Sequence, residues 1–192
     1  MYNNAAILTS VNNDNVEILE KEWEPQRQKF IKRYGPYFVR MMFEDLTPYF
    51  QDFFLNVANE LRLDTSQINR IEGFNTWYND PKIKKVDSIK YTSRIHIDTE
   101  RNVAISIPIY AISPVIFYDH DQITDTNYKK FIVKKPNQTI TYSFKHPTLL
   151  NTKNFHQVFY LNENEHRAVL QMNCMESFDN LVRRNVDKVV VL

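Results

Sequence analysis

Glycine is scarce in this sequence. Gly35 and Gly73 are the only two glycines among 192 residues, whereas the usual share is about 7%. Loops that cradle phosphate groups need several glycines at fixed spacing, because only a residue without a Cβ lets the backbone approach the phosphate closely. The composition therefore excludes a Walker loop, a dinucleotide-binding fingerprint and the lid of a protein kinase.

Cysteine and net charge are nearly absent as well. The single cysteine, Cys174, excludes a disulfide framework and a zinc site built on cysteines, and its strand-like surroundings predict an inert buried thiol. The 24 Lys and Arg residues offset 23 Asp and Glu residues, which leaves a net charge of +1. A chain with so little net charge has no broad field for nucleic acid or anionic lipid, so we expect neither as a partner.

Long hydrophobic runs are also missing. The longest apolar stretch, residues 103–117, contains Ser106, Pro108, Ser113 and Pro114 and is too short to span a bilayer. The first residues are too polar for a signal peptide. We therefore expect a soluble, cytoplasmic protein.

The period of the apolar residues changes along the chain. From about residue 16 to 62 they recur at helical spacing, and Pro25, Gly35-Pro36 and Pro48 interrupt them, which predicts short helices separated by turns. Thr47 followed by Pro48 is typical of the start of a helix. The aromatic residues of this stretch are those that a helix packed on a sheet requires.

From about residue 86 to 192 the period is two, with many β-branched and aromatic residues, which predicts about eight short strands. The expected strands are 88–97, 102–110, 114–118, 129–134, 138–144, 155–161, 167–173 and 186–192, with turns at 119–127 and 135–137 among others. We therefore expect a single domain over residues 1–192 that is mainly β, with N-terminal helices and a core that is a β-sandwich or a jelly roll.

The segment His96-Ile97-Asp98 lies in the first of these strands. Positions two apart on a strand share a face, so His96 and Asp98 project together while Ile95 and Ile97 face the other way. Such a pair is a compact two-ligand clip for a divalent metal. A hydrogen-bonded pair in a surface turn is the alternative.

A second histidine and an arginine follow at the starts of later strands. His156 comes 60 residues after His96, and Arg167 comes 11 residues after His156. A third ligand from a distant strand would complete a two-histidine, one-carboxylate triad with open positions on iron(II). The planar fork of an arginine suits the far carboxylate of an α-keto acid. Arg167 and Gln171 share one face of this strand, and Ala168 and Leu170 share the other. This alternation further predicts a polar-lined interior on the first face.

Other interpretations of these residues stay open. His156 can be a core histidine satisfied by a backbone carbonyl, and Arg167 can pair with Glu163 or Glu165. His146 is the next candidate ligand if His156 is not one, and His120 and His166 have less to support them. Tyr91, Tyr110 and Tyr118 are candidates for hydrogen bonds to a bound acid, with packing as the alternative for each.

The order of several segments resembles a known family. They are His96-Ile97-Asp98, then residues 101–109, Phe117-Tyr118, residues 150–156 and residues 165–170. This order resembles the iron(II)- and 2-oxoglutarate-dependent oxygenases, in particular their small aspartyl/asparaginyl-hydroxylase-like members from bacteria and phages, over about residues 90–174.

The resemblance implies a fold, a site and an activity. The implied fold is a double-stranded β-helix, which is a cupin-like jelly roll. His96, Asp98 and His156 would be iron ligands and catalytic residues, and Arg167 would bind the cosubstrate 2-oxoglutarate. The chain would then hydroxylate a protein side chain, an amino acid or a small metabolite. Relatives of this kind often carry glycine after the metal-binding aspartate, where this chain has Thr99.

A protein without catalytic activity is the alternative. Jelly rolls also occur in capsids and lectins, so this chain can equally be a binding module or a structural component, for example of a virion. It would then be virion-associated rather than a cytoplasmic enzyme.

Overall fold

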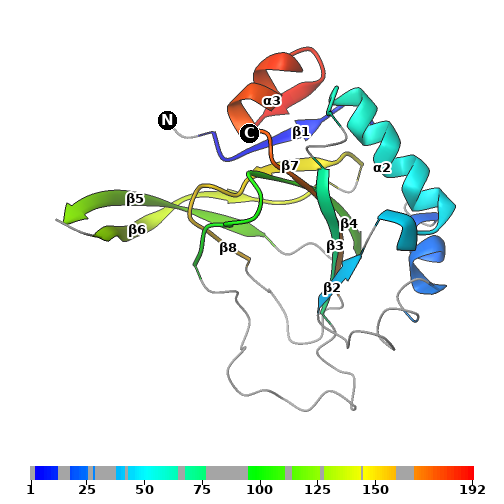
Figure 1. The fold of residues 1–192 in the computed structure, drawn as a ribbon, viewed down its shortest axis with the longest axis horizontal. Helices are drawn as coiled ribbons and strands as arrows, with labels where there is room; N and C mark the ends of the chain where they lie inside the picture. The colour runs from blue at the N-terminus through cyan, green and yellow to red at the C-terminus, as the bar shows by residue number, and fades with distance from the viewer. Residues whose placement is uncertain are drawn as a thin grey trace.

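The computed structural model describes residues 3–12, 18–25, 28, 38–41, 43–64, 68–76, 95–110, 114–125, 128–143, 145–158 and 167–192. These residues are mostly β and form two antiparallel sheets with a few helices (Figure 1). Two stacked antiparallel sheets are compatible with a β-sandwich. Among these ranges, no helix is long and apolar enough to cross a membrane.

In the part of the chain that the structure describes, the larger sheet has seven strands and the smaller sheet has three. In spatial order the larger sheet is β10 (Val189–Val191), β1 (Ala5–Leu8), β7 (Thr148–Asn151), β4 (Val103–Tyr110), β9 (Arg167–Cys174), β3 (Ile68–Thr76) and β2 (Phe38–Met41). The smaller sheet is β6 (Tyr128–Ile140), β5 (Val115–Asp125) and β8 (His156–Val158).

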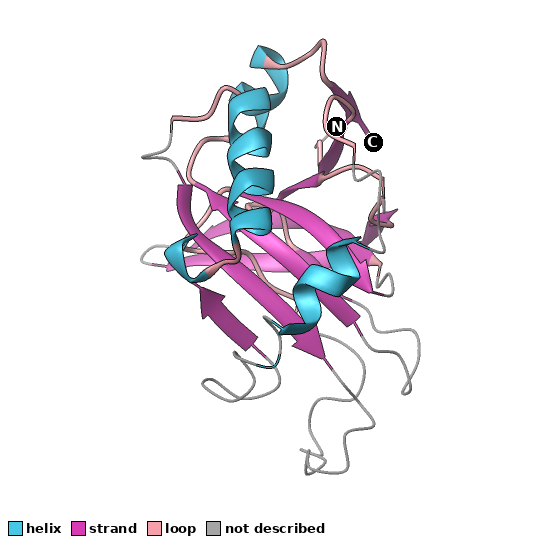
Figure 2. Cartoon of the chain, turned by 90° about the vertical axis from the view of Figure 1, so that its right-hand side faces the viewer, coloured by secondary structure: helices cyan, strands magenta, loops and turns pink. Residues whose placement is uncertain are grey.

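Helix α2 (Pro48–Glu60) lies across the larger sheet (Figure 2). Its start confirms the sequence prediction, because Thr47 is the extended N-cap and Pro48 the first helical residue. It ends at Leu61, and Arg62 then adopts a positive φ of 52°, a common way to terminate a helix. Within the described ranges, the other helical elements are residues 18–25 and 28, the short η1 (Phe43–Asp45) and α3 (Phe178–Arg184).

The two faces of the larger sheet bury different kinds of side chain. On β4, Ile105 and Ile107 pack with Phe50 and Phe54 of α2 in the main hydrophobic core. The alternate position Ala104 packs with Phe117 and other residues of the smaller sheet in a second core. Because successive side chains of a strand point to opposite faces, β4 separates a helix layer from a space between the sheets.

The structure confirms several expected elements. Strands β4 and β9 lie where the period of two placed them, and Cys174 is buried, which raises the pKa of its thiol. Of the expected strand 88–97, residues 88–94 lie outside the described residues, and His96 forms an isolated bridge with His156.

Other expected elements are wrong. Residues 38–41, expected to be helical, form strand β2 and pair with β3. The turn expected over 119–127 is instead strand up to Asp125. The turn expected over 135–137 lies inside β6, where Pro136 pairs with Tyr118 between two register shifts. A proline is tolerated there because β6 is an edge strand and the ladder is already irregular.

The packing of α2 predicts that substitutions at two adjacent positions lower the free energy of unfolding by very different amounts. Phe54 is 1% exposed in the core, whereas Leu55 is 41% exposed. We expect Phe54→Ala to lower the free energy of unfolding by about 3–5 kcal/mol, because it leaves a cavity against the sheet. Leu55→Ala is the matched control, with an expected change of less than about 1 kcal/mol. Urea unfolding measures both, and equal losses would contradict the placement of this helix.

Candidate metal centre

His96 and His156 lie directly opposite each other in an antiparallel bridge. The N–H of His96 donates to the carbonyl of His156 at 3.0 Å, and the return bond is 2.9 Å long. Opposed residues of an antiparallel pair project to the same face. The two imidazole rings accordingly lie with their centroids 4.4 Å apart. The bridge thus brings together two histidines that are 60 residues apart in the sequence.

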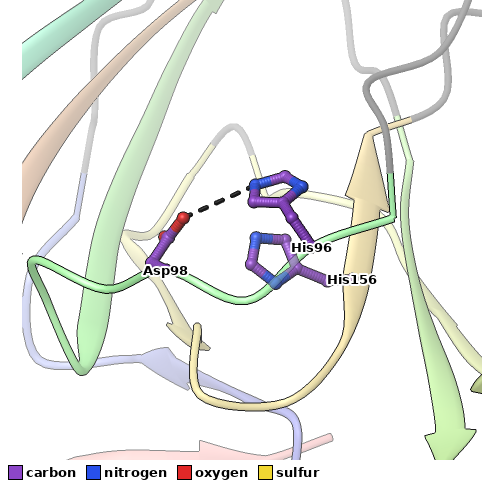
Figure 3. Close-up of side chains that lie close together, drawn as sticks. All are labelled: His96, Asp98 and His156. Atoms are coloured by element: carbon purple, nitrogen blue, oxygen red, sulfur yellow. Dashed lines mark ion pairs between the residues drawn. The ribbon is translucent and has the colours of Figure 1, made fainter. Parts of the chain in front are cut away.

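Asp98 joins this pair from the same side. Its N–H donates to the carbonyl of Thr152 at 2.9 Å, which keeps the segment after His96 alongside the loop before β8. Figure 3 shows the three side chains pointing toward one another, with His96 Nε2 3.5 Å from Asp98 Oδ1. This confirms that His96 and Asp98 share a face.

The donor atoms lie close enough together that they could hold one metal ion. One donor atom from each of His96, Asp98 and His156 lies within 4.8 Å of the others. Two ligands that are each about 2.1 Å from one ion, at angles near 90–110°, lie about 3.0–3.4 Å apart. Because the distance between His96 Nε2 and Asp98 Oδ1 is 3.5 Å, only a small adjustment is needed for both to contact one ion.

Thr99 does not prevent this arrangement. Within the described ranges, Arg62 is the one non-glycine residue with a positive φ, so the turn after Asp98 does not use the left-handed backbone that favours glycine. Lys153 Nζ donates to the carbonyls of Asp98 at 2.8 Å and of Thr99 at 3.4 Å. The turn is therefore formed and held without glycine.

The ring of His156 has the protonation state that metal binding requires. Its ring is buried, and Nδ1 lies 2.9 Å from the carbonyl oxygen of Asn154. Because a carbonyl only accepts, Nδ1 carries the proton and Nε2 keeps its lone pair. Burial and the neighbouring charge of His96 lower the pKa of His156 to about 4. The ring is therefore neutral at pH 7, which is the form that binds metals.

Asp98 is held in its charged form. Burial alone would raise the pKa of its carboxyl, but the hydrogen bond from His96 and the charge of Arg101 outweigh this and keep the pKa well below its usual value. Arg101 Nε donates to Asp98 Oδ2 at 2.5 Å. The site thus combines a neutral imidazole with an ionised carboxylate.

A buried polar layer continues from the site into the space between the sheets. Arg101 Nη1 donates to Asn173 Oδ1 at 2.7 Å and to Gln171 Oε1 at 3.2 Å, both on β9. Gln171 Nε2 in turn donates to Ser106 Oγ of β4 at 2.8 Å. All four residues are buried. The alternation along β9 predicted such a polar face, but nothing in the sequence singled out Arg101, because an arginine in a charged turn usually lies on the surface.

The structure places the remaining candidates less directly. Arg167 is the first residue of β9 and lies opposite Thr76 of β3, and its side chain is outside the described part of the structure. His146 is not part of the group, because its Nδ1 lies 2.8 Å from the carbonyl oxygen of Val11. His120 packs its ring against Phe155, with centroids 5.0 Å apart.

The tyrosine candidates do not line this site where they are described. Phe117 packs against the ring of His156, with centroids 5.8 Å apart. The next residue, Tyr118, therefore faces the other side of the sheet, where its hydroxyl donates to Gln157 at 2.6 Å. His166, Tyr91 and the side chain of Tyr110 lie outside the described residues.

The low pKa of His156 predicts a loss of stability in acid. An unfolded histidine has a pKa of about 6.5, so between pH 6.5 and 4 the unfolded chain binds more protons than the folded one. The free energy of unfolding is then complete above pH 6.5 and falls by about 3 kcal/mol as the pH drops to 4. Urea unfolding of the metal-free protein at several pH values measures this slope.

Two variants test whether His156 causes this dependence of stability on pH. His156→Gln removes the titrating ring, so we expect a flatter slope between pH 6.5 and 4, whatever its effect on absolute stability. His146→Gln is the matched control for the removal of an imidazole that lies outside the metal group. An unchanged slope in His156→Gln would contradict the buried, neutral state of this ring.

Comparisons with known proteins do not assign the chain to a family. A scan against protein-family models gives no match, and a search of the curated proteins gives none either. The function of the chain is therefore argued from its own side chains and their geometry.

Proposed function

We propose that this protein is an iron(II)- and 2-oxoglutarate-dependent dioxygenase that hydroxylates a substrate. The observation that carries the proposal is the group His96, Asp98 and His156, whose donor atoms lie within 4.8 Å of one another. Two imidazoles and one carboxylate are the donor set of non-haem iron(II) oxygenases, in which the remaining coordination positions take the cosubstrate and dioxygen.

The number of ligands supports an open site. A structural zinc site is closed by four protein ligands. In the part of the chain that the structure describes, the group contains three donors, with no fourth His, Cys, Asp or Glu. A metal held by these three residues would keep positions for other molecules.

The two histidines differ in their access to solvent. His156 is buried at 4% exposure, whereas the side chain of His96 is 40% exposed. A metal between them would have one side against the protein interior and one side open to small molecules. The buried polar layer of Ser106, Gln171 and Asn173 adjoins the site through Arg101.

Each residue has a defined task in this proposal. His96, Asp98 and His156 hold the metal, and Asp98 supplies one negative charge toward it. Arg167, on the same strand as Gln171 and Asn173, binds the far carboxylate of 2-oxoglutarate through its planar fork. Phe117 covers the ring of His156 and keeps water from that side. Bound iron and cosubstrate would supply the oxidising chemistry: one oxygen atom of dioxygen would enter succinate as 2-oxoglutarate loses CO2, and the other would enter the hydroxylated substrate.

Anaerobic addition of iron(II) and 2-oxoglutarate tests this function. We expect a visible absorption band from the metal chelate of the keto acid in the wild-type protein. His96→Ala removes a ligand and should abolish the band, whereas the control His146→Ala should keep it because His146 lies outside the group. Succinate formed on admission of oxygen is the second readout. Absence of both band and succinate in the wild type would overturn the proposal and favour a binding or structural role.

Arg167 is tested in the same assay. Hydrogen bonds between charged groups contribute about 1.5–3 kcal/mol each, so Arg167→Ala should weaken 2-oxoglutarate binding about 10–100-fold. The affinity for iron(II) itself should not change, because Arg167 is not a ligand. A titration of the iron-loaded protein with 2-oxoglutarate measures the effect. Equal affinity in wild type and variant would remove Arg167 from the cosubstrate site.

A further inference from the structure

Arg101 is an arginine held deep inside the protein. It is 8% exposed, and among the described residues its guanidinium donates to the side chain of Asp98 in the turn before β4 and to those of Gln171 and Asn173 on β9. Two different nitrogens make these bonds, Nε toward Asp98 and Nη1 toward β9. The orientation of the guanidinium is therefore fixed from two sides.

Stability alone is a poor explanation for this arrangement. Burying an ion pair costs desolvation that often cancels the attraction between the charges. In addition, the Nδ2 atom of Asn173 has no hydrogen-bond partner among the described residues, while its Oδ1 accepts from Arg101. An unpaired buried N–H costs about 1–3 kcal/mol. The residue that orients Arg101 thus leaves its own amide N–H without a partner among the described residues.

The consequence of this placement is seen at the two oxygens of Asp98. Oδ2 accepts from Arg101 Nε at 2.5 Å, whereas Oδ1 is the oxygen nearer His96, 3.5 Å from Nε2. A carboxylate can bind a metal through one oxygen or through both. With Oδ2 occupied by a cation, only Oδ1 is available on the side of the histidines.

We propose that Arg101 is a positioning residue that makes Asp98 a one-oxygen ligand. This inference rests on the proposed metal centre and specifies its coordination. The protein then contributes three donor atoms, which leaves three positions of an octahedral ion for a bidentate cosubstrate and dioxygen. Without Arg101, Asp98 would be free to rotate or to bind through both oxygens, and one of these positions would be lost.

The test is a titration of metal-free protein with cobalt(II), whose visible absorption reports ligand number and geometry. Arg101→Gln removes the charge and the fork, and Arg101→Lys keeps the charge without the fork. We expect both variants to change the cobalt spectrum, and Arg101→Gln to weaken cobalt binding about 10–100-fold, as is typical when a partner of a metal ligand is removed. Arg184→Gln is the matched control, because Arg184 pairs with Glu176 at 2.6 Å and 2.8 Å; it should leave the spectrum and the affinity unchanged.

The outcomes separate this inference from the proposed function. If the wild type binds cobalt and both Arg101 variants show its spectrum and its affinity, the role of Arg101 is wrong while the metal centre stands. If the wild type binds no cobalt, the metal centre itself is wrong. Circular dichroism establishes that each variant folds. Should the Arg101 variants not fold, Gln171→Met takes their place, because it removes one acceptor of Arg101 and keeps the ion pair. It should shift the spectrum in part, and an unchanged spectrum would again overturn the inference.

Discussion

Two backbone hydrogen bonds between His96 and His156 determine the rest of the site. They join a segment before β4 to the edge strand β8, and they turn both imidazoles to the same face. Asp98 then follows from the period of a strand, because it lies two residues beyond His96. The three side chains are therefore placed by ordinary sheet pairing, and no strained backbone is needed to bring them together.

The two faces of the larger sheet have different environments, one apolar and one polar, and the site depends on both. On one face, Ile105, Leu170 and Met172 pack in the core with α2, and this apolar burial supports the strands. On the other face, Gln171 and Asn173 form a polar layer that holds Arg101 against Asp98. A buried cation beside an ionised aspartate and a neutral histidine is a chemically specific arrangement. An apolar filling of the same space is often as stable or more stable, and it would supply no ligand set.

The sequence predicted the mainly β class and the shared face of His96 and Asp98, whereas it did not predict the order of the strands. The spacing of His96 and Asp98, and the alternation along β9, depend only on the period of a strand, and both are confirmed. Strands β1 and β7 are four residues long and pair in the middle of the sheet, so they carry little periodic pattern of their own. Residues 38–41 belong to a stretch whose apolar residues have helical spacing, yet they pair with β3, because partners distant in the sequence override local preference. The sequence did not indicate the role of Arg101, because its acceptors on β9 are 70 and 72 residues away along the chain.

X-ray absorption spectroscopy of the iron(II)-loaded protein at the iron edge tests whether His96, Asp98 and His156 bind one metal ion together. We expect one iron per chain, with the scattering pattern of two imidazole rings and nitrogen and oxygen ligands at about 2.0–2.2 Å. In His156→Gln the pattern of one ring should disappear. Iron surrounded by oxygen alone, with the same spectrum in the wild type and in His156→Gln, would show that these three residues do not share a metal.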